Sequence, residues 1–215
     1  MRKTILSSLI FSAIITIAII TATRTEVYAQ FMESYHKLSN AEQAWVRRHP
    51  IAAFRTHKLA TTARSEAQAH MQDPDLDGDL NGGMVDAFKH TLWMALTAQK
   101  IGFSKAQSLG IAHEEGNRAE FSRNPDRSGG LLQDNMMSGM DLYNNDIGAR
   151  IGSLNPKASY QTIVAMVKKA VTSGECRKLK KDGNKYLDAD GKVINETNYK
   201  GKWEIPKVMI PSNKQ

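Results

Sequence analysis

The sequence predicts an all-α fold of about six helices, packed as an irregular bundle, with a short β-hairpin appendage at the C-terminal end. Apolar residues recur at helical spacing in successive segments between residues 39 and 172, and capping residues, glycines and prolines separate these segments. From about residue 176 onwards, short apolar pairs around an Asp-Gly turn replace the helical pattern.

The first 29 residues have the pattern of a secretory signal peptide. Arg2 and Lys3 precede an apolar run over residues 5–22, and Val27-Tyr28-Ala29 ends in a small residue before a plausible cleavage site after Ala29. The run is close to the ~18 residues that a membrane span requires, so an uncleaved anchor is the alternative. We therefore expect a secreted or periplasmic protein.

The mature chain divides by charge into a helical domain, 30–175, and a basic tail, 176–215. The helical part carries 16 Lys and Arg against 16 Asp and Glu, whereas the tail carries 10 against 5. A basic tail could contact anionic surfaces, but no nucleic-acid-binding motif accompanies it, and partner and oligomeric state stay open. Cys176 is the only cysteine, so no intramolecular disulfide can form.

The helices are placed by their start and stop signals. Ser39-Asn40-Ala41-Glu42 is a capping box that opens a short helix, and Pro50 suits the first turn of a second one. We expect further helices after a loop at 73–81. Beyond these helices we expect a hairpin at Asp190-Gly191 and an additional short strand near 203–210. The predicted later helices are 50–71, 83–101, 105–118, 134–151 and 158–172, with a loop at 119–133.

The loop at 73–81 has alternate acids with a glycine in the sixth place, as in the first half of a calcium-binding loop. Its candidate ligands are Asp73, Asp75, Asp77, Asp79 and, from two residues beyond the twelfth place, Asp86. The twelfth place itself is Met84, so the usual bidentate glutamate is missing. An acidic Asp/Gly/Pro turn without a metal is the alternative.

Three predicted helices carry polar side chains about one turn apart. Asp86, His90 and Trp93 share one stripe of the third helix, because they are spaced i, i+4, i+7. We expect His113 to point inward from the fourth helix, with Glu114 at the edge of the same site. The fifth helix adds Asp141 to the candidate site. The remaining polar candidates, Asn117, Asn144 and Asn145, would orient a ligand or substrate together with Trp93.

This set has the ligand types for a divalent metal at His90, His113 and Asp141, with Glu114 beside them. The order is loosely similar to that of metal phosphohydrolases with a histidine, a His-Asp doublet and a later aspartate, although the doublet here is His-Glu. A bound metal would activate water for hydrolysis of a phosphoester or a related bond. Without a metal, Glu114 or Asp86 would act as general base and His90 or His113 as acid.

Several of these motifs together resemble an uncharacterised bacterial domain family found in secreted proteins and at the C-termini of polymorphic toxins. The resemblance covers residues 38–152 and rests on Asp86-Ala87-Phe88-Lys89-His90-Thr91-Leu92-Trp93, Ala112-His113-Glu114 and Met140-Asp141-Leu142-Tyr143-Asn144-Asn145-Asp146-Ile147-Gly148. The chain differs from the family pattern at Lys89, where an arginine is usual, and the acidic loop at 73–79 is an addition to that pattern. The resemblance implies an exported, all-α, effector-type domain but supplies no activity.

The residues therefore support two functional hypotheses. The first is an exported, metal-assisted hydrolase or effector-like enzyme that uses the cluster of Asp86, His90, His113, Glu114 and Asp141. The alternative is a non-catalytic binding or structural domain of the cell envelope, in which the same cluster is a buried hydrogen-bond network. Exposure should discriminate between them, since a catalytic cluster must reach a pocket.

Overall fold

The structure is a computed structural model and describes residues 26, 28–125 and 133–214. The chain divides into two compact units, residues 1–38 and 39–215. The predicted signal peptide falls almost entirely on residues 1–25 and 27, outside the described residues; in the first unit, residues 28–36 are helical. None of the helices in the described ranges combines the length and the hydropathy needed to cross a membrane.

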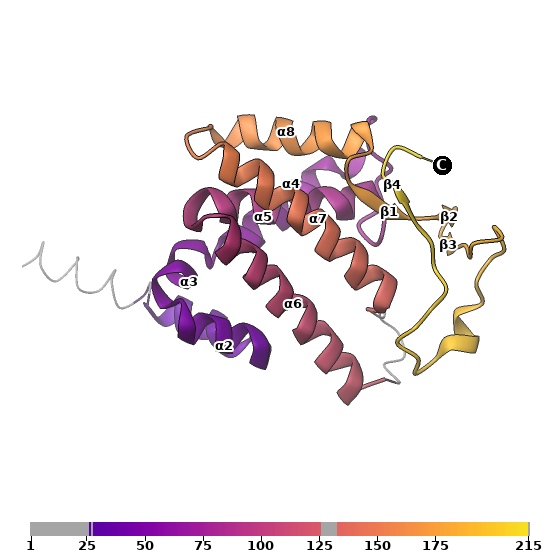
Figure 1. Cartoon of the computed structure of the whole chain (residues 1–215), viewed down its shortest axis with the longest axis horizontal. Coiled ribbons are helices and arrows are strands. Elements are labelled where there is room, and N and C mark those ends of the chain that lie inside the picture. The colour runs from indigo at the N-terminus through magenta and orange to yellow at the C-terminus, as the bar shows by residue number, and fades with distance from the viewer. Residues whose placement is uncertain (1–25, 27, 126–132, 215) are drawn as a thin grey trace, which may run out of the picture. The chain divides into compact units, whose positions relative to one another are not determined.

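The second unit is mostly helical, as predicted, with two small antiparallel sheets towards its C-terminal end (Figure 1). Seven helices are described in it, and two 3₁₀ turns accompany them. The helices are α2 (Asn40–Arg48), α3 (Pro50–Thr56), α4 (Leu59–Ala69), α5 (Met84–Ile101), α6 (Phe103–Arg123), α7 (Asn135–Leu154) and α8 (Tyr160–Ser173).

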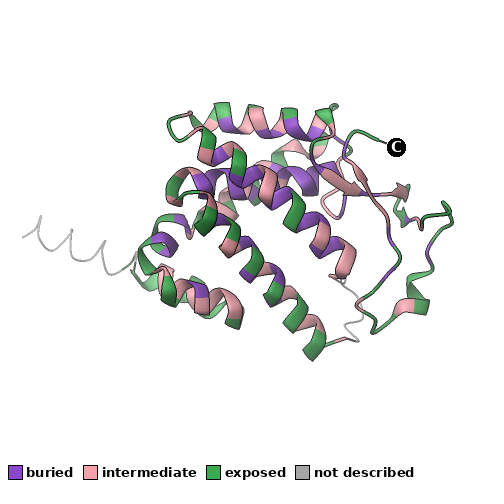
Figure 2. Cartoon of the chain, viewed as in Figure 1, coloured by how far each residue is buried: buried purple, intermediate pink, exposed green. Residues whose placement is uncertain are grey.

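Helix α5 is the centre of this unit. It packs against α4, α6, α7 and α8, and most of its residues are buried (Figure 2). Phe88 and Leu92 of α5 are fully buried in one apolar cluster with Ile163 of α8. A helix that is apolar nearly all round must be covered on every side, and its four neighbours provide this cover.

The contact between α5 and α7 is unusually close because two glycines of α7 face the backbone of α5. A Cβ atom at Gly148 would lie 2.1 Å from the carbonyl oxygen of Thr91, and one at Gly152 would lie 1.9 Å from that of Ala95. Both pairs advance four residues in the same direction, so the two helices run parallel here. This contact fixes which residues of α5 face which residues of α7.

Two predicted helix boundaries were wrong. The helix expected over 50–71 is divided into α3 and α4 by a turn at His57 and Lys58. At this turn, Nδ1 of His57 lies 2.7 Å from the carbonyl oxygen of Phe54, and the Thr56 hydroxyl donates to that of Ala52, so side chains occupy helix acceptors. In addition, α6 extends to Arg123, five residues beyond the predicted end at 118.

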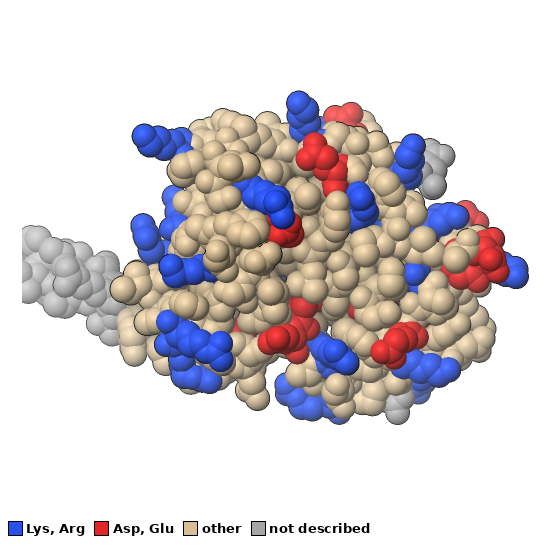
Figure 3. Space-filling view, in the orientation of Figure 1, with Lys and Arg blue, Asp and Glu red and all other residues tan. Residues whose placement is uncertain are grey.

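The C-terminal segment forms more β-structure than a single hairpin. Strand β1 (Arg177–Leu179) pairs with β4 (Met209–Pro211), and β2 (Lys181–Asp182) pairs with β3 (Lys185–Tyr186). The predicted turn at Asp190-Gly191 is present, since Leu187 and Val193 form a β-bridge across it. On the face shown in Figure 3, basic and acidic side chains are interspersed.

One buried ion pair ties this segment to the start of α7. The Lys207 ammonium lies 2.6 Å from Oδ2 of Asp134, and both side chains are almost completely buried. The other carboxylate oxygen of Asp134 accepts the backbone N–H groups of Met136 and Met137 and so caps α7. Lys207 also lies 3.6 Å from the centre of the Tyr186 ring.

The acidic loop serves as a cap and an anchor, and the prediction of calcium binding finds no support. The Asp77 carboxylate accepts the backbone N–H of Met84 at 2.8 Å and so caps α5. Lysines neutralise the loop acids, with Lys168 2.8 Å from both Asp73 and Asp75, Lys178 3.4 Å from Asp77 and Lys181 2.6 Å from Asp79. Among the described residues, the loop acids do not converge on one point as ligands of a metal would.

The close crossing of α5 and α7 predicts how one methyl group added at Gly148 changes the free energy of unfolding. We expect Gly148→Ala to destabilise the protein by about 1–3 kcal/mol, because the added Cβ forces two packed backbones apart. Gly139→Ala, in the same helix, is the matched control, since a Cβ there approaches only the Met209 side chain, at 3.7 Å. Alanine is the better helix former, so this control should be neutral or stabilising. Urea unfolding measures both, and equal effects would contradict the interpretation.

The anchoring of the loop predicts a dependence of stability on acid. Hydrogen bonds from Lys168, from the Asp75 backbone and from the His70 ring lower the pKa of Asp73 from 3.8 to about 2. A lowered folded-state pKa gives stability that is present above the unfolded-state pKa and is lost as pH falls through the folded-state value. We expect Asp73→Asn to be less stable than wild type above about pH 4, with the difference shrinking between pH 4 and 2. Thermal unfolding across this range tests it, and a difference independent of pH would contradict it.

Candidate functional site

Three side chains from two helices converge beside the crossing of α5 and α7. Asp86 and His90 lie one turn apart on α5, and Asp141 faces them from α7, with one ligand atom of each residue within 4.8 Å of the others. His90 Nε2 lies 3.3 Å from Oδ1 of Asp141 and 3.6 Å from Oδ1 of Asp86. All three residues are buried.

Each acid of the cluster is held by groups outside it, Asp86 through both oxygens and Asp141 through one. Oδ2 of Asp86 accepts the backbone N–H of Gly82 at 2.7 Å, and its Oδ1 accepts from the Lys89 ammonium. Oδ2 of Asp141 accepts from the Gln133 amide at 3.0 Å. The backbone and side-chain contacts therefore fix the orientation of both carboxylates before any ligand is considered.

Glu114 of α6 enters the same buried region. Its Oε2 accepts from the Ser138 hydroxyl at 2.8 Å and from the Asn117 amide at 3.2 Å. Its charge raises the pKa of Asp141, and the charge of Asp86 raises the pKa of Glu114, so the three carboxyls interact electrostatically. Glu114 was expected at the edge of the site and is instead 5% exposed.

Several buried polar atoms of this region have no hydrogen-bond partner. Most buried polar side-chain atoms in folded proteins are satisfied, and an unsatisfied one costs about 1–3 kcal/mol. The Asn145 side chain of α7 approaches His90 as a hydrogen-bond partner and so acts to raise the pKa of the ring, although neither polar atom of its amide has a partner of good hydrogen-bond geometry. Among the described residues, the unsatisfied atoms here are His90 Nδ1, Glu114 Oε1, Asp141 Oδ1 and both polar atoms of the Asn145 amide.

Burial dominates the protonation of the cluster. It raises the pKa of Asp141 well above its usual range, and the charges of Asp86 and Glu114 act in the same direction. Burial also raises the pKa of Asp86, although Lys89 opposes this, and it raises the pKa of Glu114. The pKa of His90 falls well below 6.5 through burial and the nearby charges of Lys89 and His113. The protein surroundings alone thus favour neutral side chains.

Of the predicted set of His90, His113 and Asp141, the metal-capable group found among the described residues includes the first and the last, and His113 makes other contacts. Its Nδ1 lies 2.9 Å from Oε1 of Glu42 in α2, and its ring contacts Trp93 edge to face at 5.2 Å. The buried face of α6 is instead marked by Ala106, Gly110 and Glu114, spaced four residues apart. His113 therefore lies beside the buried cluster with 34% of its side chain exposed.

The predicted substrate-orienting residues have different surroundings. Asn144 exchanges two hydrogen bonds of 2.9 Å with the backbone of Arg177 and so holds β1 against α7. Asn117 supports Glu114, and Trp93 packs between two apolar clusters and His113. Of the four, only Asn145 has its amide in the cluster with unsatisfied atoms.

Sequence reasoning missed Ser138 and Gln133. Ser138 is spaced i−3 from Asp141 and i−7 from Asn145, so the helical periodicity of α7 could have found it. Gln133 lies outside any helix, where periodicity carries no information. Glu42 was visible only as the second half of a capping box, a role it also has, since it accepts the Ser39 backbone N–H at 2.9 Å.

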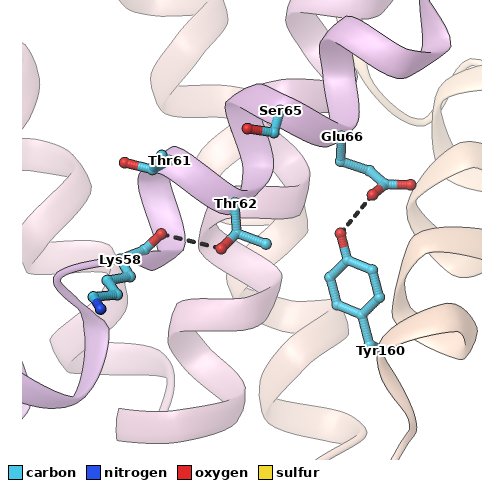
Figure 4. Close-up of a pocket in the computed structure, with 6 residues that line it drawn as sticks. All are labelled: Lys58, Thr61, Thr62, Ser65, Glu66 and Tyr160. Atoms are coloured by element: carbon cyan, nitrogen blue, oxygen red, sulfur yellow. Dashed lines mark hydrogen bonds between the residues drawn. The ribbon is translucent and has the colours of Figure 1, made fainter.

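A separate pocket of about 590 Å³ lies on the side of α4 and the start of α8 (Figure 4). The Tyr160 hydroxyl donates to Glu66 at 2.7 Å across it. Its lining includes none of the predicted site residues: Lys58, Thr61, Thr62, Ser65, Glu66 and Tyr160. The chemistry of the buried cluster, rather than this hollow, therefore identifies the candidate site.

Two of the three donor distances in the cluster match those around a small divalent cation. Donors about 2.0–2.1 Å from a tetrahedral metal are about 3.4 Å apart, close to the 3.3 Å and 3.6 Å measured from His90 Nε2. A cation would also offset the buried carboxylates and satisfy Oδ1 of Asp141. One imidazole with two carboxylates suits zinc, manganese or iron in the +2 state.

Comparison with known proteins places the chain in a family without giving it an activity. Neither the curated proteins nor the solved structures contain a match to it. A family model described as a domain of unknown function, DUF6973, matches residues 43–175 and so includes the whole cluster. Because this match covers more than half of the 215 residues, the chain belongs to the DUF6973 family.

Proposed function

We propose that the protein is an exported, metal-assisted hydrolase whose metal is held by Asp86, His90 and Asp141. One observation carries the proposal: five buried polar atoms without a partner of good hydrogen-bond geometry lie in or beside this cluster, on His90, Glu114, Asp141 and Asn145. A network that only fixed the fold would satisfy its own donors and acceptors, because a half-satisfied network is less stable than an apolar core. Atoms left open in one place are expected where a ligand completes them.

The number of donors favours a catalytic metal over a structural one. A closed structural zinc site has four protein ligands, usually with cysteine among them, whereas catalytic sites have three and leave a position for water. The group of Asp86, His90 and Asp141 offers three donors among the described residues. A metal here would lower the pKa of a bound water and polarise the bond to be cleaved.

Glu114 is the proposed general base. Its free Oε1 and its raised pKa suit a group that accepts a proton from water near neutral pH. Ser138 and Asn117 hold the other oxygen and so set its direction. His113 is the proposed acid, and Trp93 and Asn145 would orient the substrate, which is a phosphoester or a related ester.

The second candidate function is a non-catalytic binding or structural domain of the cell envelope. Its support is the burial of Asp86 and Asp141, which are 2% and 1% exposed. Partly exposed Lys89 and His113 border the cluster, however, with 27% and 34% of their side chains accessible. These two residues mark the side from which a substrate would approach.

Export and an effector role belong to the same proposal. They rest on the basic, apolar and small-residue pattern of residues 1–29 and on the resemblance to domains of secreted proteins and polymorphic toxins. Mass spectrometry of the protein recovered from the culture medium or periplasm would find an N-terminus at Gln30.

The metal site predicts a pattern among variants. Titration calorimetry of the wild type with Zn²⁺ or Mn²⁺ should show one site per chain, and the loaded protein should hydrolyse p-nitrophenyl phosphate or bis(p-nitrophenyl) phosphate. Asp141→Asn and His90→Gln should each weaken metal binding by more than about 100-fold, beyond the ~10–100-fold typical of losing a residue that only orients a ligand.

Asp75→Asn is the matched control, because this acid is 64% exposed and lies in the acidic loop. It should bind metal as the wild type does. If the wild type binds no metal and Asp141→Asn is more stable than wild type near neutral pH, the cluster is a buried network, and the enzyme proposal fails.

A further inference from the structure

Glu42 and His113 form a polar pair between α2 and α6 that the cluster does not include. Oε1 of Glu42 lies 2.9 Å from His113 Nδ1, while its Oε2 accepts the Ser39 backbone N–H and hydroxyl at 2.9 and 2.8 Å. Both oxygens of Glu42 are therefore engaged, which fixes the carboxylate. The edge of the Trp93 system confines the His113 ring from a second direction.

This arrangement determines which nitrogen of His113 is available. A proton on Nδ1 is shared with Glu42, so Nε2 is the nitrogen that can exchange a proton with another group. The charge of His113 lowers the pKa of His90 and that of Glu114 raises the pKa of His113, so the ring lies within electrostatic range of the buried site.

We propose that Glu42 is a positioning residue, which holds the His113 ring so that Nε2 delivers a proton to the leaving group of the hydrolysed ester. This inference rests on the proposed function. In the step, water attacks the phosphorus atom and gives a proton to Glu114 as the new P–O bond forms. The bond to the leaving oxygen breaks, and that oxygen takes the proton from His113 Nε2.

The charges facing His113 support its role as the acid. Burial and the charge of Lys89 act to lower the pKa of His113. The hydrogen bond and charge of Glu42, together with the charge of Glu114, raise it and outweigh them. The pKa of His113 is therefore raised above 6.5, which favours the charged form of the ring. A charged imidazole beside a leaving oxygen is a suitable proton donor.

The competing explanation is that the pair only fastens α2 to α6. Other contacts already do so, since Trp45 Nε1 donates to the Ser108 hydroxyl at 2.8 Å and Gly116 lies against the Ser39 side chain. Trp45→Phe removes one such contact without touching His113. It is therefore the matched control for a loss of helix docking.

The experiment compares wild type, Glu42→Gln and Trp45→Phe in the full mature chain. Nitrogen-detected NMR of the histidine rings gives the pKa and tautomer of His113, and the pH profile of hydrolysis with Zn²⁺ and bis(p-nitrophenyl) phosphate gives the basic limb. We expect Glu42→Gln to lower the His113 pKa below 6.5, because burial is then opposed by less negative charge, and to move the basic limb to lower pH by the same amount. Trp45→Phe should change neither.

Two outcomes would overturn the inference while the hydrolase survives: a basic limb unchanged in Glu42→Gln, or equal effects of Glu42→Gln and Trp45→Phe. If the His113 pKa shifts as expected but the wild type shows no hydrolysis at any pH, the proposed function fails and the assigned proton transfer fails with it. The NMR result then still identifies Glu42 as the group that charges His113. Glu42→Asp, which keeps the charge, should recover part of the wild-type pKa.

Discussion

The parallel crossing of α5 and α7 is the constraint on which the rest of the structure depends. Gly148 and Gly152 allow the two backbones to approach until no side chain fits between them. Protein interiors are packed without free space, so this contact leaves no freedom to slide one helix along the other. Asp141 precedes Gly148 by seven residues, about two turns of α7, and from there its Oδ1 lies 3.3 Å from His90 Nε2.

Burying the ionisable side chains of the site costs folding free energy, and neighbouring groups offset part of this cost. Three carboxyls and an imidazole lie in a region where burial favours their neutral forms. Lys89 is the cation in direct contact with the cluster, and it contacts Asp86 alone among the three acids. Stability of such a region would therefore rise on binding any cation that prefers the folded chain, in proportion to the logarithm of its concentration.

The fold was predictable because its signals are local. Capping residues, prolines and helical spacing each act within a few positions, and they place four of the seven described helices, α2, α5, α7 and α8, within a few residues of their observed ends. The division at His57 was not predictable, since no proline or glycine marks it and side chains occupy the helix acceptors there. The segment after residue 176 depends on long-range pairs such as Lys207 with Asp134, which no local pattern contains.

The candidate site was predictable in composition but not in orientation. Spacing identified Asp86, His90 and Asp141 correctly as residues that meet. It favoured His113 as the inward residue and put Glu114 at the edge, whereas Glu114 is the more buried of these two neighbours, which are about 100° apart around α6. The orientation of each side chain depends on its hydrogen-bond partner, which is Glu42 for His113 and Ser138 for Glu114. Gly110, against which Asn145 packs, was the one local indication of the buried face.

The only cysteine has a consequence for the chemical durability of the chain. Cys176 is fully buried between the helices and β1, its sulfur lies 3.4 Å from the Thr91 hydroxyl, and burial raises the pKa of its thiol to about 11. Oxidation and thiol exchange both proceed through an accessible thiolate, and this sulfur is neither accessible nor ionised at neutral pH. An unpaired cysteine commonly exposes a protein to mixed disulfides and covalent dimers, whereas this one stays inert for as long as the chain is folded.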